Sequence, residues 1–145
     1  MTTVNVYLTF NGNCEEAFNH YKTVFGKDFS MMSRFGEMPP QEGMPSMPEE
    51  AKNKIMHVSL PISQETILMG SDTGGEWASN FQAGNNFSIS INTKTTEEAD
   101  RLFAGLSEGG KVSMPLNKTF WGAYFGSFED KYGINWMINV DLNEA

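Results

Sequence analysis

The sequence predicts an α+β fold made of two βαβββ modules, and an internal repeat is the main reason. The apolar stretch Val6–Phe10 leads through a short polar loop into a helical pattern, and Phe87–Ile91 leads in the same way into a second one. Asn13 and Thr95 begin the two helical patterns, and each is followed three residues later by Glu, which is a capping signature. The offset between the two copies is more than half of the chain, far beyond the periods of about 50 residues that solenoids show. The repeat therefore indicates two copies of one supersecondary unit.

The first module should open with a strand over residues 4–10, because apolar and polar side chains alternate there. The side chains expected on its buried face are Val4, Val6, Leu8 and Phe10. A helix is then predicted from about Cys14 to Phe25, followed by a glycine that ends it. Its apolar stripe consists of Ala17, Phe18, Tyr21, Val24 and Phe25.

Three further strands complete the first module, over residues 28–35, 55–62 and 65–71. Alternation in the middle one predicts two faces. The face toward the core should carry Met56, Val58, Leu60 and Ile62, and the opposite face His57 and Ser59. Residues 36–54 form a long connection rich in proline and methionine, which suits an adaptable apolar contact. A pocket flap, a subunit contact and a loosely packed surface loop all remain open for it.

The second module repeats this order after a glycine-containing connection over residues 72–85. We expect a strand over 86–92 and a helix from about Thr96 to Ser107. The helix should be buried through Ala99, Leu102, Phe103 and Leu106. Three strands then fit into residues 111–117, 121–128 and 134–140. The whole chain, 1–145, is predicted to be one domain, with modules at about 1–72 and 86–145.

Composition excludes several classes of function. The formal net charge of −8, with ten scattered basic residues, argues against binding of nucleic acid, which needs clustered Lys and Arg. The apolar runs are far shorter than the ~20 residues that span a bilayer, and the N-terminus has no export signal, so no membrane association is expected. A single cysteine, Cys14, allows no internal disulfide and fits the cytoplasm.

Several local strings resemble the PhnB-type branch of the vicinal-oxygen-chelate superfamily, which contains glyoxalases, bleomycin-resistance proteins and dioxygenases. The strings cover nearly the whole chain: Tyr7–Ala17 with His20–Gly26, Phe35–Pro39, Ile55–Val58, Leu68–Asp72, and the tail from Phe120 through Trp121, Phe128, Asp130, Tyr132 and Trp136 to Met137. The resemblance implies two modules whose mixed sheets curl into a cup, assembled as a homodimer. Members are often labelled as demethylubiquinone methyltransferases, but no strand here is followed by a glycine-rich turn that would hold a nucleotide-type cofactor, and no cofactor is predicted.

In metal-dependent members of the superfamily, the first and last strand of each module carry His or Glu ligands. The resemblance transfers these positions to Asn5, Met69, Asn86 and Met137, the two Met positions being uncertain by one residue. Amide and thioether groups are weak substitutes for the imidazole, carboxylate or thiolate that Zn, Ni or Fe requires. We therefore expect no metal site of the usual kind.

The polar, small-residue face shared by strands 4–10, 55–62 and 86–92 is the candidate ligand site. The residues expected to line it are Tyr7, Thr9, His57, Ser59, Asn86, Ser88 and Trp121. No catalytic residue is established, and His57 is the one weak candidate, as a general acid or base. A hydrogen-bonded structural histidine is the simpler interpretation of His57.

Three other groups of residues have simple structural interpretations. Cys14 is interpreted as a small residue tolerated at a helix start, since two glutamates follow it. Asp72, Glu76, Glu129 and Asp130 are expected in loops as solvated surface, with Asp130 and Gly133 forming a turn into the last strand. The C-terminal aromatic residues are mostly assigned to the core, except Trp121, which should lie at a pocket mouth or dimer seam.

The leading functional hypothesis is a cytoplasmic homodimer that binds a small, partly apolar organic molecule in a cup between its modules, without the usual metal. One alternative is a lyase, isomerase or dioxygenase of the same superfamily that uses a divalent metal. Another is a structural dimer whose cavity is filled by its own Met and Phe side chains. The 36–48 loop and the 118–126 segment are the expected borders of the dimer interface.

Overall fold

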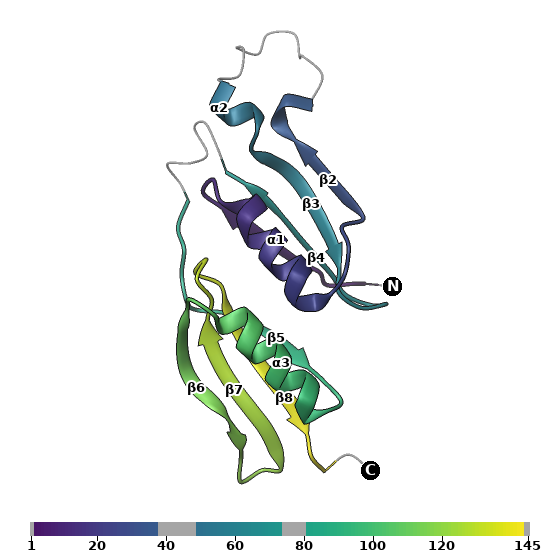
Figure 1. Cartoon of the computed structure of the whole chain (residues 1–145), viewed down its shortest axis with the longest axis vertical. Coiled ribbons are helices and arrows are strands. Elements are labelled where there is room, and N and C mark those ends of the chain that lie inside the picture. The colour runs from purple at the N-terminus through teal and green to yellow at the C-terminus, as the bar shows by residue number, and fades with distance from the viewer. Residues whose placement is uncertain (1, 38–48, 74–80, 144–145) are drawn as a thin grey trace. The chain divides into compact units, whose positions relative to one another are not determined.

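The computed structural model describes residues 2–37, 49–73 and 81–143. The chain divides into two compact units, Met1–Gln82 and Ala83–Ala145. In each unit one long helix lies across one face of a four-stranded sheet (Figure 1). This is the α+β fold with two βαβββ modules that the sequence predicts.

The first unit contains a mixed sheet with the strand order β1-β4-β3-β2, in which β1 and β4 run parallel and the other pairs antiparallel. Its elements in chain order are β1 (Val6–Phe10), α1 (Cys14–Phe25), β2 (Met31–Arg34), the short 3₁₀ helix η1 (Phe35–Glu37), α2 (Glu49–Lys52), β3 (Ile55–Pro61) and β4 (Ile67–Asp72). The bounds of α1 are those predicted. The helix α2 was not predicted, and residues 38–48 of the expected loop lie outside the described residues.

The second unit repeats this topology with the strand order β5-β8-β7-β6, and β5 and β8 are its parallel pair. Its elements are β5 (Ile89–Asn92), α3 (Thr96–Ser107), β6 (Lys111–Lys118), β7 (Ala123–Glu129) and β8 (Asn135–Asp141). The predicted helix bounds are confirmed again. β5 is shorter than predicted, so residues 86–88 precede the strand.

The core of the first unit lies between α1 and the sheet. Phe18, fully buried on α1, meets the rings of Phe10 and Tyr21 edge to face, with ring centroids 6.1 and 5.5 Å away. Gly70 on β4 lies directly beneath Phe18, where a Cβ would come within 2.6 Å of the ring. The absence of a side chain at this position therefore allows the helix to approach the sheet closely.

The second unit packs its helix in the same way. Phe103 on α3 contacts Phe128 on β7 edge to face, with ring centroids 4.9 Å apart. The residues buried between α3 and the sheet include Ala99, Leu102, Leu106, Phe128, Trp136, Ile138 and Val140. Both helix stripes that the sequence predicts thus face their sheets, although Phe25 and Phe103 are only half-buried.

The predicted strand alternation fails at two places in the first unit. Val4 precedes β1 and is 93% exposed, because no neighbouring strand pairs with it. In β3, Ser33 pairs with His57 and the next residue, Arg34, pairs with Ile55, so β3 carries one extra residue, a β-bulge at Met56. The bulge buries Ile55, while Met56 remains half-buried.

Asp72, expected to be solvated surface, is instead buried, with 4% of its surface exposed. Its Oδ1 accepts hydrogen bonds from the backbone N–H groups of Gly12 (3.0 Å) and Cys14 (2.9 Å), and its Oδ2 accepts one from Ile55 (2.9 Å). The carboxylate therefore satisfies backbone donors at the start of α1 and at the start of β3. Asn13, the predicted cap, makes no capping hydrogen bond through its side chain.

Asp130, also expected at the surface, is 2% exposed. It accepts hydrogen bonds from the backbone N–H groups of Tyr132 (2.8 Å) and Ile134 (3.0 Å) and from the indole Nε1–H of Trp136 (2.8 Å). The predicted turn is present, with Gly133 at φ 88°. The expected surface position is wrong because this turn places three donors around one carboxylate.

The predicted helix cap at Thr95 is present, whereas the predicted loop position of Glu129 is wrong. Thr95 caps α3 as predicted, accepting a hydrogen bond from the Glu98 N–H at 3.2 Å. Glu129 is a half-buried residue of β7 and not a loop residue. Glu76 lies outside the described residues.

Replacement of Asp72 should destabilise the protein strongly. In Asp72→Ala the N–H groups of Cys14 and Ile55 lose their acceptor while buried, so we expect the free energy of unfolding in urea to fall by roughly 3 kcal/mol. Asp72→Asn keeps one acceptor oxygen and should lose less. Asp141→Ala, at the exposed end of β8, is the matched control and should change stability little. Equal stability of Asp72→Ala and the wild type would contradict this role.

Candidate functional site

The face of the first sheet opposite α1 carries most of the predicted ligand residues. Strand pairing places Tyr7, Met69, Ser59 and Met31 in one row across all four strands. Paired residues share a face of a sheet, so these four side chains lie together on the face that α1 does not cover. Met31 and Tyr7 are about half exposed there. We call this surface the open face of the first unit.

Three of the predicted residues form a connected cluster on the open face. The Nε2 of His57 lies 2.8 Å from the Ser59 hydroxyl oxygen, and its Nδ1 lies 3.4 Å from the Tyr7 hydroxyl oxygen. The rings of Tyr7 and His57 are tilted by 37° with centroids 5.7 Å apart. Alternation in the sequence thus correctly predicted that Tyr7, His57 and Ser59 share one face. Thr9, two residues along β1, follows the same alternation and is exposed.

The short contact with Ser59 bears on which nitrogen of the imidazole carries the proton. A neutral imidazole has one N–H donor and one acceptor nitrogen, and the hydrogen bond at one nitrogen selects the role of the other. If Nε2–H donates to Ser59, Nδ1 is an acceptor toward the Tyr7 hydroxyl. The longer Tyr7 contact is then the weaker of the two and the easier to replace by a ligand.

Ser33 adds a polar group that the sequence did not single out. It pairs with His57 across the β2–β3 ladder, so its side chain lies on the same face. Its hydroxyl oxygen is buried and makes no hydrogen bond within the described part of the chain. A buried hydroxyl without a partner is costly, which makes Ser33 a candidate group for a bound molecule. Alternation in the short strand β2 could have indicated it.

Asn86 and Ser88, the predicted ligand residues at the start of the second unit, do not form a comparable cluster. Asn86 and Ser88 are exposed and precede β5, so the strand does not fix their direction. The predicted strand was too long because the ladder with β8 begins only at Ile89. The face of this sheet opposite α3 carries amides instead, and the Asn139 amide nitrogen lies 3.2 Å from the Asn92 side-chain oxygen.

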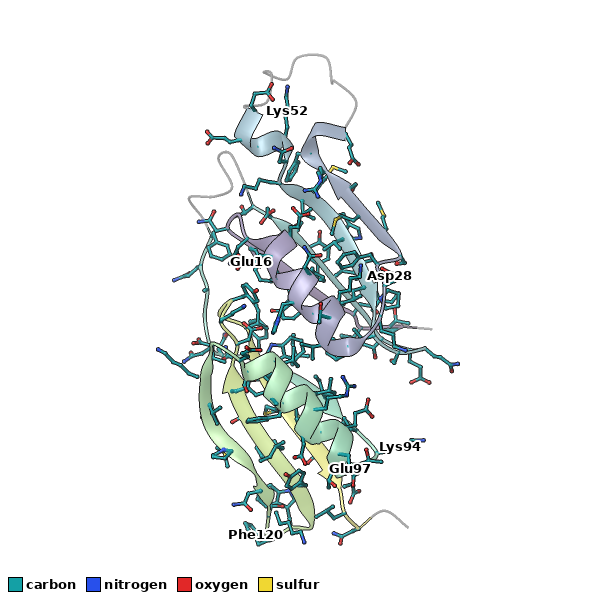
Figure 2. The ribbon with its side chains drawn as sticks, in the orientation of Figure 1. Glu16, Asp28, Lys52, Lys94, Glu97 and Phe120 are labelled. Carbon is teal, nitrogen blue, oxygen red and sulfur yellow. The ribbon has the colours of Figure 1, made fainter. Side chains whose placement is uncertain are left out.

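Trp121 lies at the turn between β6 and β7 and is 55% exposed. Its ring is packed against Phe120, with centroids 5.0 Å apart, and lies 6.4 Å from Phe125. Phe120 is 97% exposed, and Figure 2 shows it at the far end of the β6 and β7 ribbons. The structure therefore presents an exposed aromatic pair at this turn.

The residues at the expected metal positions do not fit a metal of the usual kind. Met69 and Met137 lie on the strands expected, β4 and β8, while Asn5 and Asn86 precede β1 and β5. Amide and thioether groups lack the charge and basicity that Zn, Ni or Fe ligands supply. Within residues 2–37, 49–73 and 81–143, no three His, Cys, Asp or Glu side chains are grouped as a metal would need.

Cys14 is a structural residue. Its side chain is fully buried at the first turn of α1. Burial raises the pKa of the thiol well above its usual range, and the nearby carboxylates of Asp72 and Glu15 raise the pKa further. The helix start would favour a thiolate, but these effects outweigh it. The predicted interpretation as a small, unreactive residue agrees with this environment.

Comparisons with known proteins agree on one family. The family model described as 3-demethylubiquinone-9 3-methyltransferase matches residues 2–139. The protein YjdN of Escherichia coli (strain K12) is 33% identical over 139 residues, which cover 92% of each chain.

Solved structures extend these similarities. The protein PA1353 from Pseudomonas aeruginosa is 39% identical with a TM-score of 0.81, covering 97% of this chain and 98% of its own. A putative 3-demethylubiquinone-9 3-methyltransferase, PhnB protein, from Bacillus cereus is 26% identical with a TM-score of 0.74, covering 96% and 99%. Glyoxalase/bleomycin resistance/dioxygenase structures at 15% and 13% identity share the fold alone.

The environment of Cys14 predicts slow reaction with thiol reagents. With the native protein, iodoacetamide should leave Cys14 unmodified, because the thiol is both buried and protonated. After unfolding in urea, one label should be added. Mass spectrometry of the intact protein measures both states. Rapid labelling under native conditions would contradict the structural assignment.

Proposed function

The chain belongs to the family described as 3-demethylubiquinone-9 3-methyltransferase, in the PhnB-type branch of the vicinal-oxygen-chelate superfamily, and from this membership we propose that it binds a small, partly apolar organic molecule. The proposed site is the open face of the first unit, without the metal of metal-dependent members. The observation that carries the proposal is the Tyr7–His57–Ser59 cluster. Its hydrogen-bonding groups are partly exposed on a sheet face that α1 leaves uncovered.

The surroundings of the cluster suit a ligand of mixed polarity. Met31 and Met69 lie beside Ser59 in the same row, and thioether side chains adapt to apolar groups of different shape. Ser33 offers a hydroxyl that has no hydrogen-bond partner among the described residues. Small-molecule sites typically combine apolar walls with a few converging polar groups. This combination supports binding of an organic molecule more than binding of a free ion.

The methyl transfer named in the family description is not part of this proposal. The described strand-to-helix connections of the two units are Asn11-Gly12-Asn13 and Thr93-Lys94-Thr95, and neither is a glycine-rich turn. The start of α1, where anionic groups of a cofactor often bind, already receives the Asp72 carboxylate. The local structure therefore supports binding more directly than use of a nucleotide-type methyl donor.

A thermal-shift screen against metabolites and antibiotics tests the binding proposal. A ligand at 100 times its Kd should stabilise the wild type by about 2.7 kcal/mol and raise its Tm. The shift should persist after treatment with a chelator, since no metal is invoked. His57→Ala should reduce the shift, because the ligand loses a hydrogen-bonding partner on the open face.

The control is His20→Ala on α1, which should keep the full shift. A ligand whose shift is equal in the wild type and in His57→Ala would show that it binds elsewhere. A shift that requires added divalent metal would favour the metal-dependent alternative.

We further propose that the protein acts as a cytoplasmic homodimer. Strands β2 and β6 lie at the edges of their sheets, and edge strands need cover or pairing. Phe120 and Trp121 provide an exposed aromatic contact beside the β6 edge. The cytoplasm suits a chain whose single cysteine is a free thiol. None of the described helices is long and apolar enough to cross a membrane.

The dimer proposal predicts an aromatic contact at the β6–β7 turn. Phe120→Asp combined with Trp121→Ser should shift the protein toward monomer at micromolar concentration in light scattering. An obligate interface buries about 2,000 Å² or more, and aromatic side chains often dominate its energy. Val4→Asp, at an apolar position that is 93% exposed and outside the strands, should leave the dimer intact. A wild-type protein that is monomeric at this concentration would contradict the proposal.

A further inference from the structure

The Tyr7–His57–Ser59 cluster places the Nδ1 of His57 3.4 Å from the Tyr7 hydroxyl oxygen. We propose that the open face of the first unit catalyses proton abstraction from a partly apolar carbonyl compound, with the Nδ1 of His57 as general base and the Tyr7 hydroxyl as hydrogen-bond donor to the developing oxyanion. This inference rests on the binding site proposed above. It adds a reaction class that requires no metal.

Ser59 is the positioning residue in this arrangement. Its hydroxyl oxygen lies 2.8 Å from Nε2. In the tautomer that the proposal requires, this oxygen accepts the Nε2–H, and Nδ1 carries no proton. Ser59 itself is anchored by the β3 ladder, where it pairs with Met31 on one side and Met69 on the other. A neutral imidazole with a fixed acceptor nitrogen is the form that a general base needs.

Tyr7 is suited to donate a hydrogen bond to the oxyanion, because its contact with the Nδ1 of His57 is long. At 3.4 Å the resting hydrogen bond is weak, and Tyr7 is about half exposed. A substrate that takes its place at Nδ1 frees the phenolic O–H to donate to the substrate oxygen. Donor and acceptor then lie on either side of one reacting group, as in other sites that enolise carbonyl compounds without metal.

The step balances without any further reactant. Nδ1 takes the proton from the carbon next to the carbonyl, and the C–H electron pair forms the C=C bond of an enolate. The carbonyl π pair moves to oxygen, where the Tyr7 O–H donates a hydrogen bond. The imidazolium then returns the proton to a carbon of the enolate, which gives an isomerised product and restores the neutral base.

The probe for this chemistry is 5-nitrobenzisoxazole, because its reaction also needs a base that takes a proton from carbon and a donor that stabilises a developing oxyanion. A base removes its ring C–H proton, the C–H pair forms a nitrile, and the N–O bond breaks to leave a coloured phenolate. We expect saturable turnover by the full-length protein. His57→Ala should lower kcat by about 100-fold, the range of general-base catalysis. His57→Gln, which keeps a polar side chain, should be equally inactive, and circular dichroism verifies that both variants fold.

Variants of Tyr7 and Ser59 should have different effects on the kinetics. Tyr7→Phe should lower kcat by about tenfold, less than a fully buried oxyanion donor would, since Tyr7 is half exposed. Ser59→Ala should lower kcat with KM unchanged, and Ser59→Thr, which restores the hydroxyl, should recover part of it. The matched controls are His20→Ala on α1 and Tyr124→Phe, whose hydroxyl donates to Asp100 on α3.

Turnover equal in the wild type and in His57→Ala would overturn the inference, as would absence of turnover in both. The binding proposal is judged separately, by ligand shifts that depend on His57. A protein that shows those shifts without His57-dependent turnover is a binding protein and not a proton-transfer catalyst.

Discussion

The first unit depends on the buried carboxylate of Asp72. It lies at the end of β4 and accepts hydrogen bonds from three backbone N–H groups that belong to the β1–α1 connection, to α1 and to β3. The N–H of Cys14 is the first of α1 and has no partner within the helix, since the first N–H groups of a helix never do. A negative charge at the start of α1 also interacts favourably with the helix dipole. One side chain thus joins the start of α1, the start of β3 and the end of β4, which are far apart in the sequence.

The orientation of the candidate site follows from this junction. Asp72 fixes the start of β3 at Ile55, which is buried, and regular alternation would then place His57 on the same face as Ile55. The extra residue at Met56 reverses this relation, so Val58 and Leu60 face α1 while His57 and Ser59 point to the open face. β-Bulges commonly redirect a side chain in this way beside functional sites. The direction of His57 is therefore a consequence of the core and not of the site alone.

The sequence predicted what depends on local periodicity and missed what depends on distant partners. Both long helices and the βαβββ order of elements along the chain follow from patterns within about ten residues, and the shared face of Tyr7, His57 and Ser59 follows from alternation. Asp72 was misjudged because an acidic residue near a glycine-rich stretch is usually solvated, and its donors Gly12 and Ile55 are identified only by the fold. Ser33 was missed because β2 is short and its pairing with His57 is a property of the sheet.

The two units share a topology but satisfy their polar groups differently, and this difference bears on function. The second unit caps α3 with Thr95 and uses its buried Asp130 to hold the β7–β8 turn. Its open sheet face joins the amides of Asn92 and Asn139, groups that neither accept nor release protons near neutral pH. The chain has only two histidines, and both belong to the first unit. Duplication therefore preserved the scaffold in both halves, while both histidines of the chain lie in the first.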